Sequence, residues 1–151
     1  MQLSNEVKTV RIKPDGSGYV VAAGAADVNS DIVDMQGFHG VRFIIGFGAI
    51  VAGAATSVKA QQNTINSGTG MADLAGTAVT VADNDDNQIV VLDIYKPRER
   101  YLRLTTLRAT QNSTIDFLLA EFYEPWKVPV TEDATIVVAA EKHVSPAEGT
   151  A

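Results

Sequence analysis

Short apolar stretches separated by segments rich in glycine, asparagine and aspartate run along most of the chain. Alternation of apolar and polar residues with a period of two is typical of a strand with one buried face. Over residues 56–62 it predicts that Val58 and Ala60 face inward and that Lys59 and Gln61 face outward. Strands are expected over residues 7–12, 19–23, 41–47, 56–62, 78–82, 88–95, 101–109 and 114–124, with an edge strand near Ile32. The pattern predicts an all-β sandwich or barrel of about eight strands.

The last of these strands has a mixed pattern. The leucine and alanine content of residues 114–124 suits a helix, but Ile115, Phe117 and Leu119 alternate and the neighbouring segments are strands. We therefore expect a strand, with Phe117 and Phe122 inside the core. The residues expected to share one side of the preceding strand are Leu102, Leu104 and Thr106.

The uncharged segment from Phe43 to Val58 raises the question of a membrane helix. It has 16 residues, fewer than the roughly 20 that span a bilayer. Interior glycines and β-branched or aromatic residues also give it a poor helix propensity. The better interpretation is two core strands joined by a small-residue connection over 48–53.

Residues 63–77 and the C-terminal part have the composition of loops. The first segment is rich in Gly, Thr and Asn and is expected to be a long excursion between strands. We expect a β-sandwich domain over 1–125 and an extended C-terminal arm over 126–151, in which 135–140 (TIVVAA) resembles a strand. Such a strand needs a partner, either an edge of its own sheet or the sheet of a neighbouring subunit. Both alternatives stay open, and loss of oligomer mass on deletion of residues 128–151 would favour the second.

Charge and composition exclude several classes of protein. The chain has 12 basic and 18 acidic side chains, a net charge of −6, which argues against a nucleic-acid partner and disfavours an anionic membrane surface. It contains no cysteine, so disulfides and thiolate sites are excluded. No secretory signal is recognisable at the start, and we expect assembly in a reducing cell.

No pattern of catalytic or metal-binding residues stands out. His39 and His143 are about a hundred residues apart, and no zinc spacing, nucleophile elbow or phosphate-binding loop is present. The acidic segment DNDDN over 83–87 begins like a calcium loop, but Gln88 and Ile94 occupy the positions that need Gly and Glu. We expect no enzyme activity, no cofactor and no metal.

Two features point instead to interaction with another protein. Residues 96–100 (KPRER) concentrate three basic side chains in an acidic chain. They are interpreted either as a hairpin turn with local ion pairs or as a basic rim for an acidic partner. Trp126 follows the last core strand and is either a lid on the core, which is the commoner case, or an interface anchor.

Several stretches resemble a known family. NEVKTVRI, DIVDMQGFHGVRFIIGFGAI, VKAQQNT and KPRERYLRLTTLRAT…IDFLLAEFYEP are similar in pattern and order to the head decoration, or cement, proteins of tailed bacteriophages. The resemblance covers most of residues 5–125. It implies a jelly-roll-like β-sandwich and a symmetric homo-oligomer, with a trimer preferred and a dimer possible. It also implies attachment to the major capsid protein on the capsid exterior, after synthesis in the host cytoplasm.

The first functional hypothesis is therefore a structural virion protein that clamps neighbouring capsomers. The alternative is a carbohydrate-binding β-sandwich, such as a lectin-like or head-fibre module, and an enzyme of the cupin type is a third. The residues proposed for an interface are Val7, Val10, Arg11, Lys96, Arg98, Arg100, Trp126, Ile136 and Val138.

Overall fold

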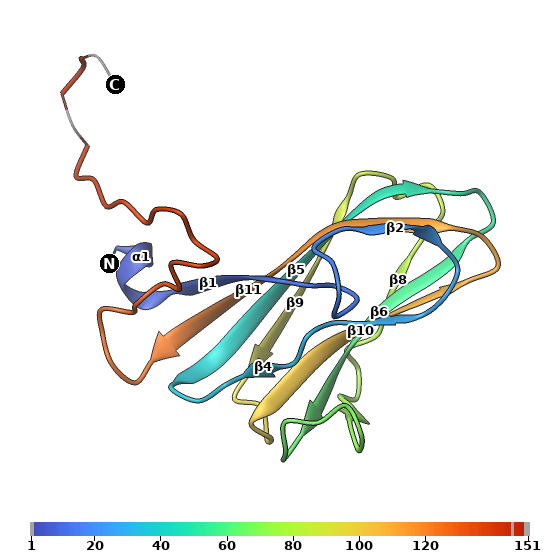
Figure 1. Cartoon of the computed structure of the whole chain (residues 1–151), viewed down its shortest axis with the longest axis horizontal. Helices are drawn as coiled ribbons and strands as arrows, with labels where there is room; N and C mark the ends of the chain where they lie inside the picture. Colours follow the sequence, from blue (N-terminus) through green and yellow to red (C-terminus); the bar gives the residue numbers. More distant parts are fainter. Residues whose placement is uncertain (1, 146, 150–151) are drawn as a thin grey trace.

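The computed structural model describes residues 2–145 and 147–149, and its regular secondary structure is almost entirely β (Figure 1). One short helix, α1 (Leu3–Glu6), precedes the first strand. The strands are β1 (Lys8–Ile12), β2 (Val21–Gly24), β3 (Val28–Asn29), β4 (Val33–Asp34), β5 (Phe38–Ile50), β6 (Ala55–Asn63), β7 (Ala72–Asp73), β8 (Val79–Val81), β9 (Ile89–Tyr95), β10 (Tyr101–Ala109) and β11 (Ser113–Pro125).

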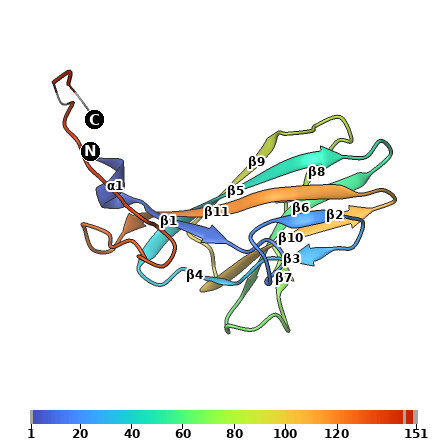
Figure 2. The ribbon, with the colours of Figure 1, turned by 45° about the horizontal axis from the view of Figure 1, so that its top comes forward.

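The strands form two antiparallel sheets that face each other (Figure 2). Sheet A has the order β1-β11-β5-β9, and β2 follows β1 along the same edge of β11. Sheet B has the order β3-β10-β6-β7, with β4 beside β10 and β8 beside β6. Three positions are thus each shared by two short strands. The eleven strands occupy eight positions, in the order of a jelly roll, and the expected fold class is confirmed.

The core lies between the sheets. Val41, Phe43, Ile45 and Phe47 of β5 point inward and are almost completely buried. Val58 and Ala60 of β6 face them from sheet B and are fully buried, as the alternation predicts. The uncharged segment is therefore two core strands, although they lie in opposite sheets and β5 continues to Ile50 before the chain crosses over.

In β11 the expected inner face is only partly correct. Ile115 is buried, but after it the inward positions are Leu118, Ala120 and Phe122, while Phe117 lies on the outer side. The register with β5 shifts between Ile115 and Phe117, which marks a β-bulge. One extra residue reverses the inward and outward positions that follow it.

The C-terminal arm forms no strand in its described residues, so residues 135–140 do not pair with an edge of their own sheet, and pairing with a neighbouring subunit stays a prediction. The N–H groups of Ile136 and Val137 both donate to the carbonyl of Asp133, which makes a turn. Residues 126–132 instead run beside the N-terminal segment of the same chain. The N–H of Val130 donates to the carbonyl of Asn5, and the N–H of Thr9 donates to the Glu132 carboxylate.

Candidate functional site

A cleft at one end of the sandwich brings together four of the residues proposed from the sequence. The connection 96–100 passes from β9 in sheet A to β10 in sheet B and forms one wall. The start of β5 and the first residue after β11 form the other wall. The cleft has a volume of about 420 Å³. The sequence-derived residues that line it are Lys96, Arg98, Arg100 and Trp126, and His39 joins them.

Trp126 is an exposed part of this cleft. Its backbone N–H donates to the carbonyl of Gly37 at 2.8 Å, and its ring centroid lies 6.3 Å from that of His39. The side chain is 67% exposed, so the expectation of a lid on the core is wrong. Phe38 and Phe122, with ring centroids 5.3 Å apart, already close the core at this end. The indole therefore remains available to another molecule.

The basic residues of the connection divide into one paired and two unpaired side chains. Arg100 donates from Nε and Nη2 to the two carboxylate oxygens of Asp34, each at 2.7 Å. Lys96 and Arg98 form no ion pair with any described residue, and both are exposed. The 96–100 connection is thus a crossover between the two sheets and not a hairpin. Its one ion pair joins Arg100 to Asp34 of β4.

The Asp34–Arg100 pair changes the acidity of both groups. The hydrogen bonds from Arg100 are the main reason why the pKa of Asp34 lies below its ordinary value. The same bonds raise the pKa of Arg100. Both side chains therefore keep their charges at neutral pH, and this wall of the cleft is held by a fixed ion pair while Lys96 and Arg98 carry free positive charge.

The other proposed interface residues lie away from the cleft. Val10 and Ile136 line one groove between β1 and the C-terminal arm, and Val7 lines another. Arg11 stacks over the ring of Tyr19 at 4.8 Å. Val138 is fully exposed. The structure therefore places Val7, Val10 and Ile136 at contacts of the chain with its own arm.

The acidic loop after β8 holds the turn between β5 and β6. Asp83 accepts a hydrogen bond from the N–H of Gly53, and Asp86 accepts one from the N–H of Ile50, each at 2.6 Å. His39 lies in the cleft, whereas His143 lies in the arm beside Glu141. Among the described residues no three His, Cys, Asp or Glu side chains gather in a group that would hold a metal ion.

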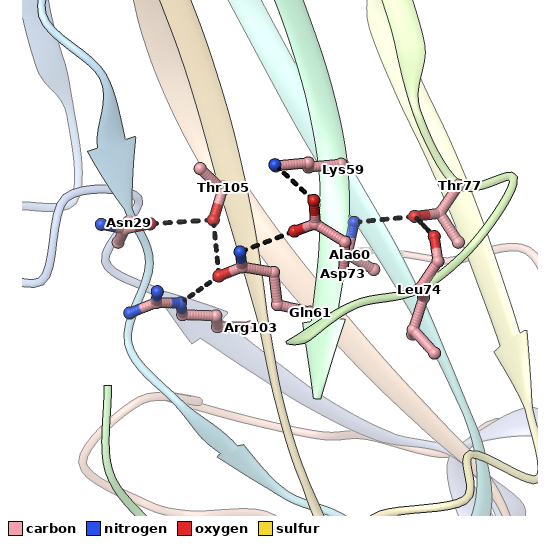
Figure 3. A network of polar contacts seen from close by, with 9 residues as sticks. All are labelled: Asn29, Lys59, Ala60, Gln61, Asp73, Leu74, Thr77, Arg103 and Thr105. Carbon is pink, nitrogen blue, oxygen red and sulfur yellow. Dashed lines mark hydrogen bonds and ion pairs between the residues drawn. The ribbon is translucent and has the colours of Figure 1, made fainter. Parts of the chain in front are cut away.

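Sequence reasoning missed a polar network on the outer face of sheet B (Figure 3). Gln61 is its centre: its amide oxygen accepts from Nε of Arg103 at 2.7 Å, and its amide nitrogen donates to Asp73 at 2.7 Å. Lys59 pairs with the same carboxylate at 2.7 Å, and Thr105 lies 3.1 Å from the Gln61 oxygen. The outward positions of Lys59 and Gln61 were predicted, but their partners depend on the register with β7 and β10.

The network makes sheet B a rigid polar surface. Burial lowers the pKa of Arg103, and none of the described carboxylates forms an ion pair with it. Hydrogen bonds from Lys59 and then Gln61 lower the pKa of Asp73. These groups bind one another across the three strands β10, β6 and β7.

Comparison with solved structures gives distant likenesses, whereas comparison with protein families and curated sequences gives none. No protein-family model matches the chain, and no curated protein sequence matches it. Among solved structures, it is similar to chitosan-binding module 1 derived from a chitosanase/glucanase of Paenibacillus sp. IK-5, with 18% identity and a TM-score of 0.36. The match covers 82% of this chain and 98% of that one. A likeness of this size carries no argument about ligand. The described residues form no helix with the length and hydrophobicity that a bilayer crossing requires.

Proposed function

We propose that the chain is a non-catalytic structural protein that attaches to the outside of a phage capsid and stabilises it by bridging neighbouring capsomers. The proposal rests above all on the cleft, where an exposed tryptophan lies beside two free cationic side chains in an acidic protein. The resemblance of residues 5–125 to head decoration proteins supports it.

The chemistry of the cleft suits a protein surface. Tryptophan and arginine are the residues that most often dominate the energy of a protein–protein interface. Lys96 and Arg98 add positive charge that attracts an acidic patch and raises the rate of encounter. The expected partner is therefore an acidic region of the major capsid protein. Several such contacts in one oligomer would multiply the avidity of a modest single contact.

Co-sedimentation with undecorated capsids tests the proposal. Wild-type protein should pellet with capsids at a fixed stoichiometry. Trp126→Ala should weaken binding by about 30-fold, as expected for a hot-spot residue, and Lys96→Glu with Arg98→Glu should weaken it most at low salt. The control is Ile65→Ala, which changes an exposed apolar residue on the 63–71 loop. A wild-type protein that stays in the supernatant, or a Trp126 variant that binds as well as the control, would contradict the proposal.

A carbohydrate-binding module is the second candidate. The exposed Trp126 ring beside His39, with polar side chains around it, is the observation that favours it, because sugars stack on aromatic rings. Glycan-array binding that disappears in Trp126→Ala, together with no binding to capsids, would select this function over the first.

A further inference from the structure

The two sheets have four outer edges, and three of them are blunted. In sheet A, the edge beside β11 consists of the short strands β1 and β2, and the Glu132 carboxylate of the arm accepts the N–H of Thr9 on β1. In sheet B, the edge strands β3, β4, β7 and β8 have only two or three residues each. Short or covered edges prevent unwanted strand pairing.

The remaining edge is β9, and it has none of these protections. The strand runs for seven residues, IVVLDIY, with no proline, lysine or bulge, and its register with β5 is unbroken. β9 is the last strand of sheet A, and its one neighbour in the sheet is β5. A long, regular edge whose one charged side chain is Asp93 is a template for another strand.

The backbone groups on the free side of β9 can be identified. The carbonyl of Gln88 accepts from Phe47, and the N–H of Lys96 donates to His39, so even-numbered residues bond to β5. In an antiparallel strand the groups of alternate residues point to opposite sides. The backbone groups that point away from the sheet are therefore the N–H and C=O of Ile89, Val91, Asp93 and Tyr95. On that free side, none of them has a hydrogen-bond partner among the described residues.

Three of the same residues have exposed apolar or aromatic side chains, and Asp93 lies between them. Ile89 is 57% exposed, Val91 47% and Tyr95 52%. The ring of Tyr95 is already held in place, because it stacks on Tyr123 with the planes 7° apart. A preorganised ring at a strand edge suits a cross-strand contact with a β-branched residue.

We propose that β9 pairs antiparallel with β9 of a second copy of this chain across a two-fold axis. Charge selects this partner: β9 is preceded by Asp83, Asp85 and Asp86 and followed by Lys96 and Arg98. In an antiparallel pair, the acidic end of each copy comes beside the basic end of the other, and the complementarity occurs twice.

One register pairs all seven residues. It places Leu92 opposite its own symmetry mate, Ile89 opposite Tyr95, and Val91 opposite Asp93. The register centred on Asp93 would place two carboxylates opposite each other, which is unfavourable. The pairing joins the two A sheets into one continuous sheet of eight positions. It is argued from the strand edge and not from the function proposed above, although both draw on the charges of Lys96 and Arg98.

Light scattering after size exclusion over a dilution series tests the pairing. Wild-type protein should have twice the 16.0 kDa of one chain. Val91→Pro removes an outward N–H and no bond to β5, and it should weaken the dimer by at least about tenfold. Val91→Thr keeps the N–H and should leave the dimer largely intact. A single-chain or three-chain mass for wild type, or a Val91→Pro protein that stays dimeric, would overturn the proposal.

Two substitutions of opposite charge at Val91 test the register. They also replace Val91→Pro if circular dichroism shows the proline variant to be unfolded. Val91→Asp places a second carboxylate opposite Asp93 of the other copy and should give single chains. Val91→Lys places an ammonium there and should retain the dimer. If both variants are single chains, the register is excluded. If both are dimers, the β9 contact itself is excluded.

Discussion

Arg108 shows how one buried charged residue connects several elements. Only 6% of the residue is exposed. Its Nε donates to the carbonyl of Ala26 at 2.7 Å, and its Nη1 donates to the carbonyls of Ala22 and Ser113 at 3.1 and 2.9 Å. Burial lowers the pKa of the guanidinium, while nearby Asp27 acts in the opposite direction. The side chain thus ties β10 to the β2–β3 connection and to β11.

Replacing Arg108 with methionine should destabilise the fold. Three carbonyls would lose a charged donor, and buried polar groups without partners are costly. We expect the free energy of unfolding to fall by about 3 kcal/mol in urea denaturation. Arg98→Met, at an exposed position with no ion pair to a described residue, should change it by less than about 0.5 kcal/mol. Equal stability of the two variants would contradict this role of Arg108.

The Asp34–Arg100 ion pair should make stability depend on pH in the acid range. The pKa of Asp34 is below its ordinary value of 3.8, chiefly because Arg100 donates to it. A depressed carboxyl pKa stabilises the fold above the ordinary value, and the contribution is lost as the pH falls through the folded-state pKa. In unfolding measured from about pH 5 down to about pH 2, Asp34→Asn should lose less stability than wild type.

The partner variant provides the control. Arg100→Gln should reduce the acid sensitivity by a similar amount, and the double variant should add nothing further because both changes remove the same interaction. A double variant whose acid sensitivity falls well below that of either single variant would show that the two residues act separately.

At this scale the sequence predicts positions better than partners. Alternation places Val58 and Ala60 inward correctly, and it also places Arg108 on the inward side together with Leu102 and Leu104. An arginine at a position that alternation places inward was the sequence feature that could have indicated the buried guanidinium of Arg108. No local pattern shows that Trp126 is exposed, because that depends on Phe38 and Phe122 already filling the end of the core.

Among the elements, β5 and β11 are joined by aromatic side chains that cover glycines. A Cβ at Gly40 would lie 2.1 Å from the Tyr123 ring, and one at Gly46 would lie 2.2 Å from the Phe117 ring. The side chains of β11 therefore lie flat across the outer face of β5. Gly40 and Gly46 are therefore required because the rings of Tyr123 and Phe117 approach the β5 backbone so closely.

Gly46→Ala should destabilise the protein because the added methyl overlaps Phe117. We expect a loss of about 1–3 kcal/mol in the free energy of unfolding, the usual cost of overpacking. In the background of Phe117→Ala the same substitution should cost much less, since the space is then open. A double-mutant cycle with no coupling would show that the glycine is needed for another reason.

Element predictions failed where the pairing partner decides the outcome. The bulge between Ile115 and Phe117 lets β11 follow β5, and no feature of β11 alone marks it. Residues 135–140 have strand composition, but no strand of their own chain pairs with them, and the outward N–H of Thr9 on β1 already donates to the Glu132 carboxylate. Propensity without a free ladder does not produce a strand.

For the whole molecule, the C-terminal arm acts as a cover for the first strand. Removal of residues 127–151 should expose the N–H of Thr9 and the carbonyl of Asn5. Hydrogen exchange at Thr9 should accelerate, and the free energy of unfolding should fall by about 1–2 kcal/mol for the lost hydrogen bonds.

A shorter deletion is the matched control. Removing residues 143–151 leaves the bonds made by Val130 and Glu132 and the contact between Lys142 and Asn5. This variant should exchange its Thr9 amide at the wild-type rate. Acceleration by both deletions to the same extent would contradict the contacts of residues 127–142 as the cause.

The order of the strands was the part of the fold that residue patterns alone did not supply. Alternation locates strands, but it does not say that β1 lies beside β11 or that β5 and β6 lie in different sheets. The jelly-roll arrangement was expected only through the resemblance to decoration proteins. Among the site residues, the sequence indicated the basic connection and Trp126 separately, and only the fold shows that they meet in one cleft.

The pairing of β1 with β11 also sets a condition on synthesis. Lys8 lies opposite Phe122, so the first strand cannot find its place until almost the whole chain has left the ribosome. Pairings this distant in sequence make folding slow, and until they form, sheet A lacks its first strand and the chain stays incompletely folded. Cells that produce the protein quickly would therefore contain many incompletely folded chains, and slower translation should increase the yield of soluble protein.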